Sequence, residues 1–497
     1  MKKHWQMLNP DLKQVHELSQ KLRCYTVTAS VLINRNISDP KAAEKFLDPS
    51  LKYLRSPFSL LDLDLAINRI YRAILGKEKI LIFGDYDVDG VTATVILLNF
   101  LRYAGADVSF YIPHRVTEGY SIQPAHISSY AHPHKIDLII TADCGSDSHQ
   151  AVLAAKRCGI DIIITDHHTI AEKIPPALAV INPKRRGCPA GLQMLAGVGV
   201  AFFLLICLRT HLREKGFWQE RPEPNLKKYC DLVALGTIAD MVPLVEENRI
   251  LCRTGLEQIH AGGRPGLKAL LAASAVSNDY LNADDIAYRL APRLNAAGRM
   301  DHAARAVELL TAENMEIAKE KAHTLNKLNQ RRRLIEQGIL VEIQRYIENN
   351  SSILQQRSLV LAGEGWHAGV LGIVASQMVN IYCRPVVLIT TRNGIGTGSG
   401  RCLPGLNLYG ALRSCKQYLE NFGGHSMAAG LRIREENIND FQSAFESVIQ
   451  RTTDSEDLTP TLPIDSELDL AMISDTLVDE LESLMPFGTE NPEPLFL

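Results

Sequence analysis

Residues 79–90 read KILIFGDYDVDG, an apolar run that leads directly into Asp85, Asp87 and Asp89. A continuous apolar run of this length is typical of a strand that is buried on both faces, as in a parallel sheet covered by helices. Three carboxylates so close together repel one another unless positive charge lies among them. The stretch therefore predicts both a buried strand and a cation-binding edge.

The same pattern occurs twice more. Residues 135–145 (KIDLIITADCG) and 159–169 (GIDIIITDHHT) each contain an apolar run that stops at an aspartate. The segments 91–105 and 149–159 between these runs have helical character, and both end at a glycine. Alternation of strand and helix predicts a doubly wound α/β domain with a parallel sheet.

Polar side chains follow all three predicted strands. One aspartate after a strand is commonly a turn former or a helix cap. In doubly wound sheets, however, ligands bind beyond the carboxyl ends of the strands, and several strand ends converge there. We therefore expect a functional site formed by Asp85, Asp87, Asp89, Asp143, Asp166, His167 and His168.

Carboxylates with one or two imidazoles suit Mn²⁺ or Mg²⁺ better than a structural zinc ion. The acidic groups exceed what one ion needs, which favours two ions that activate water for phosphoryl transfer. A further ligand is expected from 231–244 (DLVALGTIADMVPL), where Asp240 ends a predicted helix, although a plain helix-end residue is the alternative. Adjacent histidines rarely face one ion, so we assign His167 to the metal and His168 to the phosphate or to supporting contacts.

Length and composition set wider limits. The chain has 497 residues, 46% hydrophobic and 22% charged, with a net charge of −3, which predicts a soluble protein of two or three domains. No secretory signal is visible, and no C-x-x-C pair occurs among the ten cysteines, so we expect a cytoplasmic protein. The basic runs 183–187 (PKRRG) and 329–334 (NQRRRL) could form local patches for a nucleic-acid partner, but taken alone each is interpreted as solvated surface.

The motifs DYDVDG, ADCG, TDHHT and GTIADMVPL, in that order, resemble the DHH phosphoesterase superfamily. Further motifs are similar to those of its RecJ family of single-stranded-DNA-specific exonucleases: IPHRVTEGYSI (112–122), LAGVGVAFFL (195–204), APRLNAAGRM (291–300), GWHAGVLGIVASQM (365–378), GSGR (398–401) and FGGHSMAAGL (422–431). The resemblance extends from about residue 55 to residue 497.

The resemblance implies a 5′-to-3′ exonuclease that releases mononucleotides from single-stranded DNA in repair and recombination. It also implies a cofactor of two Mn²⁺ or Mg²⁺ ions. It also suggests a monomer that works beside a single-strand-binding protein and a helicase. The family's metal ligands fall on Asp87, Asp89, Asp143, His167 and Asp240, with Asp143 bridging and with Asp85 and Asp166 in support. Arg115 matches the arginine that meets the terminal 5′ phosphate, and Arg299 or Arg293 would contact the backbone nearby.

A second α/β unit is expected after a long helix. We expect an N-terminal extension (1–54), a DHH domain with a helical part (55–312), a connector helix (313–350), a DHH-associated domain (355–455) and the start of an oligonucleotide-binding domain (456–497), with a cleft between the two α/β domains. Residues 456–497 are too short for a complete five-stranded barrel, so we expect that domain to be truncated.

Two stretches of the second unit are interpreted as substrate-gripping loops. In GTGSGR, backbone N–H groups and Arg401 could close on a phosphate, with Ser399 beside them. In GGHS, two glycines permit close approach of His425 to a ligand. For either glycine-rich stretch, a tight turn is the alternative. His425 and Tyr120 could stack on a base, as non-specific single-strand binders do.

Two rival functions remain. A DHH pyrophosphatase or small-nucleotide phosphatase would share the metal site, but Arg115, Arg299 and Arg401 favour a polymeric substrate. A catalytically inactive replication scaffold would have lost metal ligands, whereas every metal position here carries a suitable side chain. We therefore favour the exonuclease.

Overall fold

The computed structural model describes residues 4–170, 173–277, 281–454 and 458–497. The chain forms two compact units. The larger unit comprises Leu8–Asn329 and Asp465–Leu497, and the smaller unit comprises Gln330–Ile464 with strand β1 (His4–Met7). Helix α15 (Met315–Asn349) runs from one unit into the other, as expected of the connector helix.

The larger unit contains a five-stranded, wholly parallel sheet in the order β3-β2-β4-β5-β6. Its strands are β2 (Lys79–Gly84), β3 (Asp107–Tyr111), β4 (Leu138–Ala142), β5 (Asp161–Thr165) and β6 (Ala179–Ile181). The three strands expected from the apolar runs are therefore β2, β4 and β5. The sequence interpretation missed β3 and β6, which lie at the two edges of the sheet.

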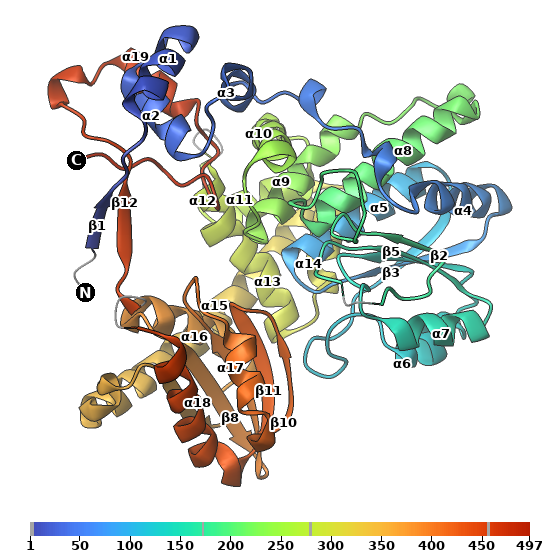
Figure 1. Ribbon diagram of the computed structural model, residues 1–497. Coiled ribbons are helices and arrows are strands. Elements are labelled where there is room, and N and C mark those ends of the chain that lie inside the picture. The colour runs from blue at the N-terminus through green and yellow to red at the C-terminus, as the bar shows by residue number, and fades with distance from the viewer. Residues whose placement is uncertain (1–3, 171–172, 278–280, 455–457) are drawn as a thin grey trace. The chain divides into compact units, whose positions relative to one another are not determined.

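Helices cover both faces of this sheet, so the predicted doubly wound α/β domain is confirmed. Figure 1 shows α4 (Leu63–Gly76), α5 (Val88–Tyr103) and α8 (Gly197–Glu214) on one side and α6 (Pro124–His126) and α7 (His149–Arg157) on the other. The apolar face of each layer is buried, with Ile80, Ile82 and Ile140 on the α5 side and Leu81, Ile139 and Ile162 on the α7 side. Alternation of this kind explains why the strands are apolar throughout.

The remaining helices of the larger unit extend this core. They are α9 (Cys230–Ala239), α10 (Glu246–Ala261), α11 (Pro265–Ala273), α12 (Ala283–Asp285), α13 (Ala291–Met300) and α14 (Ala304–Leu310). Helix α8 is largely buried, with most of its side chains between Gly197 and Leu208 in the core. Among the described residues, no helix is long and apolar enough to cross a membrane.

The N-terminal helices pack against the C-terminal segment within the larger unit. Helices α1 (Leu12–Leu22), α2 (Thr26–Asn34) and α3 (Pro40–Leu47) share a small apolar core with Leu484, which follows α19 (Asp475–Glu482). The buried guanidinium of Arg249 donates hydrogen bonds to the carbonyl oxygens of Phe46, Ser483 and Leu484. One arginine thereby joins three segments that are distant in the sequence.

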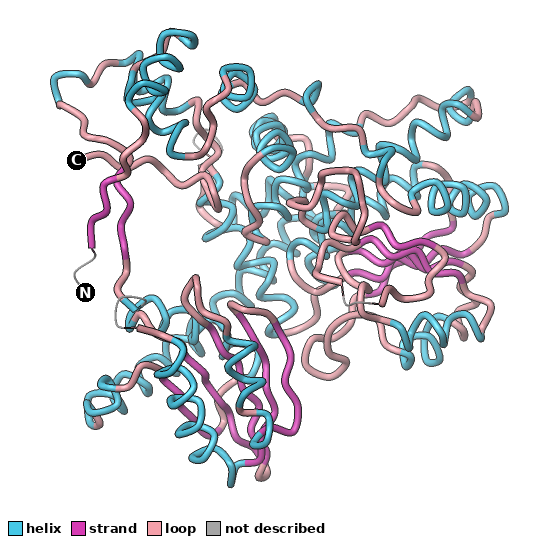
Figure 2. The backbone as a smooth tube through the Cα atoms, in the orientation of Figure 1, coloured by secondary structure: helices cyan, strands magenta, loops and turns pink. Residues whose placement is uncertain are grey.

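The smaller unit contains a mixed five-stranded sheet, β10-β11-β9-β8-β7. The strands are β7 (Leu359–Glu364), β8 (Val386–Arg392), β9 (Ile395–Arg401), β10 (Leu419–Gly424) and β11 (Ala428–Arg434), and β1 pairs separately with β12 (Thr461–Ile464). Figure 2 shows the strands of the main sheet flanked by helices. Helices α17 (Leu408–Ser414) and α18 (Ile438–Thr452) contribute to a core on one face, and α16 (Ala368–Tyr382) contacts β8 and β9.

Candidate metal centre and substrate residues

The acidic residues lie where the strand order of the larger sheet reverses. Strand β2 continues to β3 on one side, whereas β4 lies on its other side, so the crevice between β2 and β4 is the topological switch point. Asp85 and Asp87 follow β2, and Asp143 follows β4. The parallel sheet therefore brings carboxylates from two strand ends to the position at which such folds bind ligands.

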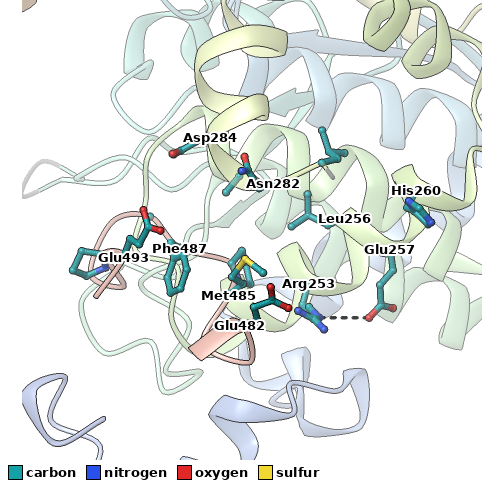
Figure 3. Close-up of a pocket in the computed structure, with 15 residues that line it drawn as sticks. Arg253, Leu256, Glu257, His260, Asn282, Asp284, Glu482, Met485, Phe487 and Glu493 are labelled. Carbon is teal, nitrogen blue, oxygen red and sulfur yellow. Dashed lines mark ion pairs between the residues drawn. The ribbon is translucent and has the colours of Figure 1, made fainter. Parts of the chain in front are cut away.

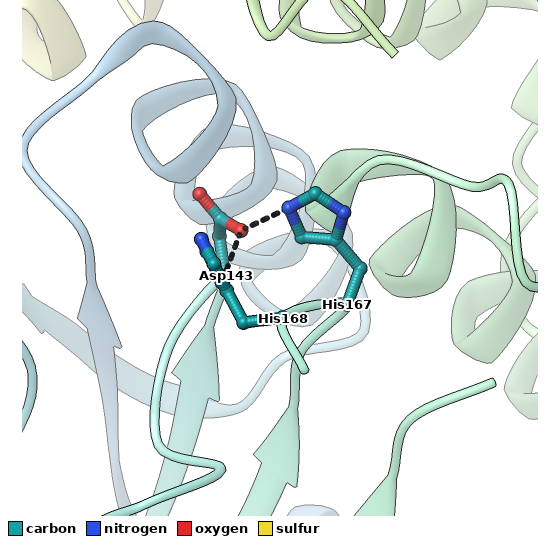
Figure 4. Close-up of side chains that lie close together, drawn as sticks. All are labelled: Asp143, His167 and His168. Carbon is teal, nitrogen blue, oxygen red and sulfur yellow. Dashed lines mark ion pairs between the residues drawn. The ribbon is translucent and has the colours of Figure 1, made fainter. Parts of the chain in front are cut away.

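His167 lies at the centre of a first group of possible ligands. Its Nε2 atom is 3.3 Å from Asp143 Oδ1, 3.5 Å from Asp240 Oδ2 and 3.7 Å from Asp89 Oδ2. Figure 4 shows the His167 and His168 side chains both close to one oxygen of the Asp143 carboxylate. His167 thus belongs to two sets of possible ligands, one with Asp89 and Asp240 and one with Asp143 and His168, and carboxylate and imidazole groups of this kind suit a divalent ion.

A second group shares Asp143 with the first. One carboxylate oxygen each from Asp85, Asp87 and Asp143 lies within 4.8 Å of the others. Asp143 thus belongs to both groups, as a bridging ligand must. Asp85, assigned from sequence to a supporting role, belongs to this group of possible ligands together with Asp87.

Local backbone structure places these side chains. Asp87 caps α5, where its Oδ1 accepts a hydrogen bond of 3.1 Å from Gly90 N, and this cap explains why the helix begins at Val88 rather than at residue 91. The Asp89 carboxylate accepts hydrogen bonds from Gly197 N and Val198 N at the start of α8. Asp240 terminates α9.

The position of the Asp143 side chain depends on an unusual backbone conformation and on a neighbouring glycine. Its φ is +64°, a left-handed conformation that aspartate tolerates better than most residues. A Cβ atom on Gly197 would lie 2.4 Å from Asp143 Oδ1. Gly197, the first glycine of the LAGVGV motif, therefore leaves room for the shared carboxylate of Asp143.

Several buried carboxylates lie close together in this centre, so a bound cation would stabilise their ionised forms. Burial, reinforced by neighbouring carboxylates, raises the pKa of Asp89 to about 7 and the pKa of Asp240 to about 9. Burial and the charge of Asp89 also raise the pKa of Asp143 well above its usual range. Burial and the charge of His168 lower the pKa of His167 to about 3, so its imidazole is neutral and can act as a ligand.

The residues fit a divalent metal for a further reason. Within the described parts of the chain, both ring nitrogens of His167, Asp143 Oδ1 and Asp85 Oδ1 are buried without a hydrogen-bond partner. Buried polar atoms are nearly always satisfied, so several orphans at one point indicate an absent partner. Oxygen and imidazole donors without a thiolate match Mn²⁺ or Mg²⁺.

His168 has a different environment. Its Nδ1 donates a 2.8 Å hydrogen bond to Asp166 Oδ1, and Tyr120 Oη lies 3.3 Å from the same nitrogen. Burial alone would lower the pKa of His168, but the hydrogen bond to Asp166 raises that pKa to about 9. The pKa of Asp166 is held below its usual range, because the hydrogen bond and charge of His168 outweigh the effect of burial. Asp166 therefore holds His168 as a cation beside the metal-ligand groups.

Two of the predicted substrate arginines lie near Tyr86. The Arg115 guanidinium lies 4.7 Å from the ring centroid of Tyr86, the residue between Asp85 and Asp87. Arg299 is close enough for its charge to lower the pKa of Tyr86, although burial makes the net shift upward, to about 12. Arg293 instead donates to Asn326 Oδ1 and to the carbonyl oxygen of Arg289, so these bonds already engage its guanidinium.

The interpretation of GTGSGR as a phosphate-binding loop is wrong. These residues form strand β9, whose backbone pairs with β8 on one side and β11 on the other. Cβ atoms on Gly396, Gly398 and Gly400 would lie about 3 Å or less from side chains of Ile389, Leu431 and Leu408, respectively. The alternating glycines thus allow close packing, and their N–H groups belong to the sheet.

Ser399 and Arg401 lie on the opposite face of β9 from these glycines. Arg401 donates a 3.2 Å hydrogen bond to Ser399 Oγ, and both side chains lie over Gly372 of α16. His425 follows β10 and is exposed. The two side chains on β9 thus lie together on one face, and His425 is accessible near the end of the neighbouring hairpin.

The two basic runs are not simply solvated surface. Arg185 of PKRRG pairs with Asp62 at 2.6 Å, and Arg332 of NQRRRL is buried and pairs with Glu336 at 3.0 Å. Sequence reasoning also missed Asn295, whose Oδ1 accepts a hydrogen bond from Val88 N. The only signal for Asn295 was its place in the APRLNAAGRM motif.

A cavity lies away from the metal centre in the larger unit. It has a volume of about 850 Å³ and lies between α10, the start of α12 and the segment 482–493. Figure 3 shows the Arg253–Glu257 ion pair at its wall. None of the residues assigned to the metal or to the substrate lines this cavity.

Family models match three parts of the chain. The DHH family N-terminal domain matches residues 79–237, the DHHA1 domain matches residues 355–451 and the RecJ OB domain matches residues 464–497. The first two contain the parallel and the mixed sheet, respectively. The third matches the C-terminal segment that packs against the N-terminal helices.

Whole-chain comparisons agree with these domains. The chain is 36% identical to the single-stranded-DNA-specific exonuclease RecJ of Bacillus subtilis over 99% of its own length and 61% of the relative's. It is 40% identical to RecJ of Salmonella typhimurium, over 90% of its own length and 80% of that relative's. It therefore spans about three fifths of the first relative and four fifths of the second.

Solved structures give the same result. The RecJ structure of Thermus thermophilus in complex with Mn²⁺ has a TM-score of 0.85 at 32% identity, covering 99% of this chain and 69% of that one. The Mg²⁺ complex of the same protein has a TM-score of 0.77 at 31% identity, with 99% and 67% coverage. Because this similarity extends over nearly the whole chain and over four fifths of a relative that is 40% identical, the chain belongs to the RecJ family of single-stranded-DNA-specific exonucleases.

Proposed function

We propose that this chain is a metal-dependent exonuclease that degrades single-stranded DNA in the 5′-to-3′ direction and releases mononucleotides. The observation that carries the proposal is Asp143, which belongs both to the group around His167 and to the group with Asp85 and Asp87. Two adjacent sites that share one carboxylate suit hydrolysis of a phosphodiester. The names of the relatives and their Mn²⁺ and Mg²⁺ complexes support the same reaction.

Asp87, Asp89, Asp143, His167 and Asp240 would hold two Mn²⁺ or Mg²⁺ ions. When bound, such ions supply a nucleophilic water at neutral pH and neutralise charge that develops on the phosphate. The protein contributes orientation: Asp89 is held by the start of α8, and Asp166 holds His168 by its Nδ1 atom. His168, as a cation, would bind a non-bridging oxygen of the scissile phosphate.

The terminal nucleotide would be positioned by groups around the metals. Arg115, stacked on Tyr86, would bind the 5′ phosphate, and Arg299 would contact the backbone nearby. Ser399, Arg401 and His425 would contribute further contacts, and Tyr120 would stack on a base. Arg293 is the weakest candidate in this set because its guanidinium is engaged by Asn326. Binding through phosphates predicts weak sequence preference and a strong dependence on salt.

We further propose that the chain acts as a cytoplasmic monomer beside a single-strand-binding protein and a helicase. A helicase would supply the single strands that such an enzyme requires. The mass of the protein in dilute solution tests whether it is a monomer, and the mass after addition of a single-strand-binding protein tests whether the two form a complex. A stable homodimer would contradict the first, and absence of any complex would contradict the second.

The decisive experiment is digestion of one oligonucleotide, single-stranded or as a duplex, labelled at either end. Immediate release of a mononucleotide from the 5′ label, on the single strand alone and with Mn²⁺ but not with chelator, is expected. Early release from the 3′ label would contradict the polarity. Binding without any cleavage would contradict the proposed activity.

A further inference from the structure

The cavity of about 850 Å³ beside α10 has a largely apolar lining. We call it the α10 cavity, and its apolar lining residues are Leu256, Leu281, Ala283, Met485, Pro486, Phe487 and Pro492. Leu256, Met485 and Phe487 are half-buried, so each retains apolar surface that an occupant could cover. Cavities of about 300–1,000 Å³ bind ligands chiefly through such surface.

Hydrogen bonds fix the wall that residues 484–491 form. The buried Asn491 donates from Nδ2 to the carbonyl oxygens of Leu484 and Pro486. Leu244 N donates a 2.8 Å hydrogen bond to the carbonyl oxygen of Thr489, which joins this wall to the end of α9 and the segment before α10. The wall is therefore a formed part of the fold, and an occupant would not need to order it.

Carboxylates surround the apolar lining. The acidic lining residues, all of them exposed, are Glu257, Asp284, Glu482 and Glu493. Figure 3 shows Leu256, Met485 and Phe487 in the middle of the lining, with carboxylates around them. The other ionisable lining residues are Arg253, whose Nε lies 3.8 Å from Glu257 Oε1, and His260. Residues 465–497 contain no lysine, arginine or histidine, so this segment supplies no positive charge to the cavity.

This combination of groups disfavours DNA and favours a protein segment. Carboxylates repel phosphates, and the lining shares no residue with the predicted metal ligands or substrate contacts. Apolar surface inside an acidic rim matches a segment that inserts apolar side chains and places lysines or arginines over the carboxylates. In such interfaces the apolar centre supplies most of the affinity, and the complementary charges at the rim select the partner and speed association.

We propose that the α10 cavity is a docking site for a basic, apolar segment of a partner protein. Leucine- or phenylalanine-like side chains enter the cavity, and flanking lysines or arginines face Glu482 and Glu493 of the C-terminal segment and Asp284 of α12. The inference goes beyond the exonuclease function and does not depend on it. Because the cavity and the metal centre share no residue, the partner could dock while DNA is digested.

Fluorescence anisotropy with designed peptides tests the site on the unaltered protein. The probe is a short labelled peptide with Leu-Phe-Leu at its centre and lysines at both ends. One comparison peptide has glycines at its centre, and another has glutamates at its ends. We expect the first change to weaken binding about tenfold or more, because it removes apolar surface that the cavity would bury. We expect a similar loss for the glutamate peptide, because its charges are repelled.

Equal affinity of the lysine peptide and the glycine-centred peptide would overturn the proposal, because binding would then be a general attraction between charges. Equal affinity of the lysine and glutamate peptides would also overturn it, because the carboxylates would then select nothing. No binding of the lysine peptide at about 1 mM would overturn it outright.

Charge-reversal variants of the protein test where the peptide binds. Glu482→Lys changes a lining residue, and we expect it to weaken binding of the lysine peptide about fivefold. Asp479→Lys is the matched control, because Asp479 is exposed on the same helix, α19, and does not line the cavity. Asp479→Lys should leave the affinity nearly unchanged. Equal losses in the two variants would place the peptide outside the cavity and overturn the site.

Two further measurements separate the remaining explanations. Thermal denaturation followed by circular dichroism is expected to give the same Tm for both variants as for the wild type. If Glu482→Lys fails to fold, the peptide series on the unaltered protein still decides the proposal. Sedimentation of the protein alone should show a monomer. A dimer that Glu482→Lys dissociates would show that a second copy of the chain occupies the cavity, and it would overturn a separate partner.

Discussion

Two five-stranded sheets in this chain carry motifs that look equally chemical, but the motif on β9 of the mixed sheet is closely packed and paired, whereas the motifs of the parallel sheet leave a cluster of polar atoms unsatisfied. At the carboxyl edge of the parallel sheet, Asp85, Asp143 and His167 retain buried atoms without hydrogen bonds. In the mixed sheet, the glycines of β9 are surrounded by apolar side chains, and their backbone is paired on both sides. Unmet polar atoms distinguish a reaction centre from a packing motif more sharply than residue type does.

The largest expected effect is at the shared carboxylate. Asp143→Ala should lower single-strand exonuclease activity about a thousandfold or more, because ~4 kcal/mol of transition-state stabilisation depends on both ions. Single-turnover digestion with Mn²⁺ measures the change. Asp107→Asn, an exposed aspartate at the opposite edge of the sheet, is the control and should retain full activity. Activity above one tenth of the wild type in Asp143→Ala would contradict a shared ligand.

Metal binding should stabilise the larger unit strongly. At Mn²⁺ concentrations a hundredfold above Kd, the free energy of unfolding should rise by about 2.7 kcal/mol per ion, and chelator should reverse the gain. Thermal denaturation followed by circular dichroism measures this. No shift of Tm with Mn²⁺ would contradict a metal centre at the β2–β4 crevice.

The stabilisation by Mn²⁺ should depend on pH, and the raised pKa values of the carboxyl groups determine the sign of this dependence. A carboxyl with a raised folded-state pKa favours the folded state when protonated, and this contribution is lost as pH rises through that pKa. The pKa values of Asp89 and Asp240 are about 7 and about 9. The free energy of unfolding of the metal-free protein should therefore decrease as the pH rises from 4 to 9. Mn²⁺ should therefore stabilise more at pH 8 than at pH 5. Asp89→Asn should flatten the metal-free profile, and an unchanged slope would contradict the assignment.

A smaller effect is expected at the glycine beside the shared carboxylate. Gly197→Ala would place a Cβ atom 2.4 Å from Asp143 Oδ1 and should weaken Mn²⁺ binding about 10- to 100-fold by displacing that side chain. Titration of Mn²⁺ followed by electron paramagnetic resonance gives the affinity. Gly199→Ala, two residues further along α8, is the control, because its Cβ would meet only a leucine side chain at 3.1 Å. Equal affinities in the two variants would show that Gly197 has no special role.

The smallest effect concerns packing in the mixed sheet. Gly398→Ala would bring a Cβ atom 2.9 Å from the Leu431 side chain and should lower the stability of the smaller unit by about 1 kcal/mol, without changing Mn²⁺ affinity. Urea denaturation measures the loss. Gly430→Ala on the neighbouring strand meets only a carbonyl oxygen at 3.8 Å and should cost less. A loss of Mn²⁺ affinity in Gly398→Ala would remove the distinction between the two sheets.

Much of the metal centre could be predicted because its signals are local. A buried strand has a readable apolar run, and parallel strands must end at the same edge, so the runs before Asp85, Asp143 and Asp166 placed these carboxylates together. Strand β6 was missed because it has only three residues, and β3 was missed because it carries polar residues and is only partly buried. GTGSGR was misread because glycine looks the same in a turn and in a crowded strand.

The sequence by itself determined the doubly wound fold, the long helix α15 and most of the acidic and imidazole groups at the carboxyl edge. These properties depend on periodicity and on residue type, which the chain carries locally. Only the tertiary structure decided that Asp85 lies in one ligand group with Asp87 and Asp143, that Asp166 binds His168 Nδ1 and that Gly197 makes room for the shared carboxylate. These features depend on distances between atoms from different strands and helices, which no local pattern contains.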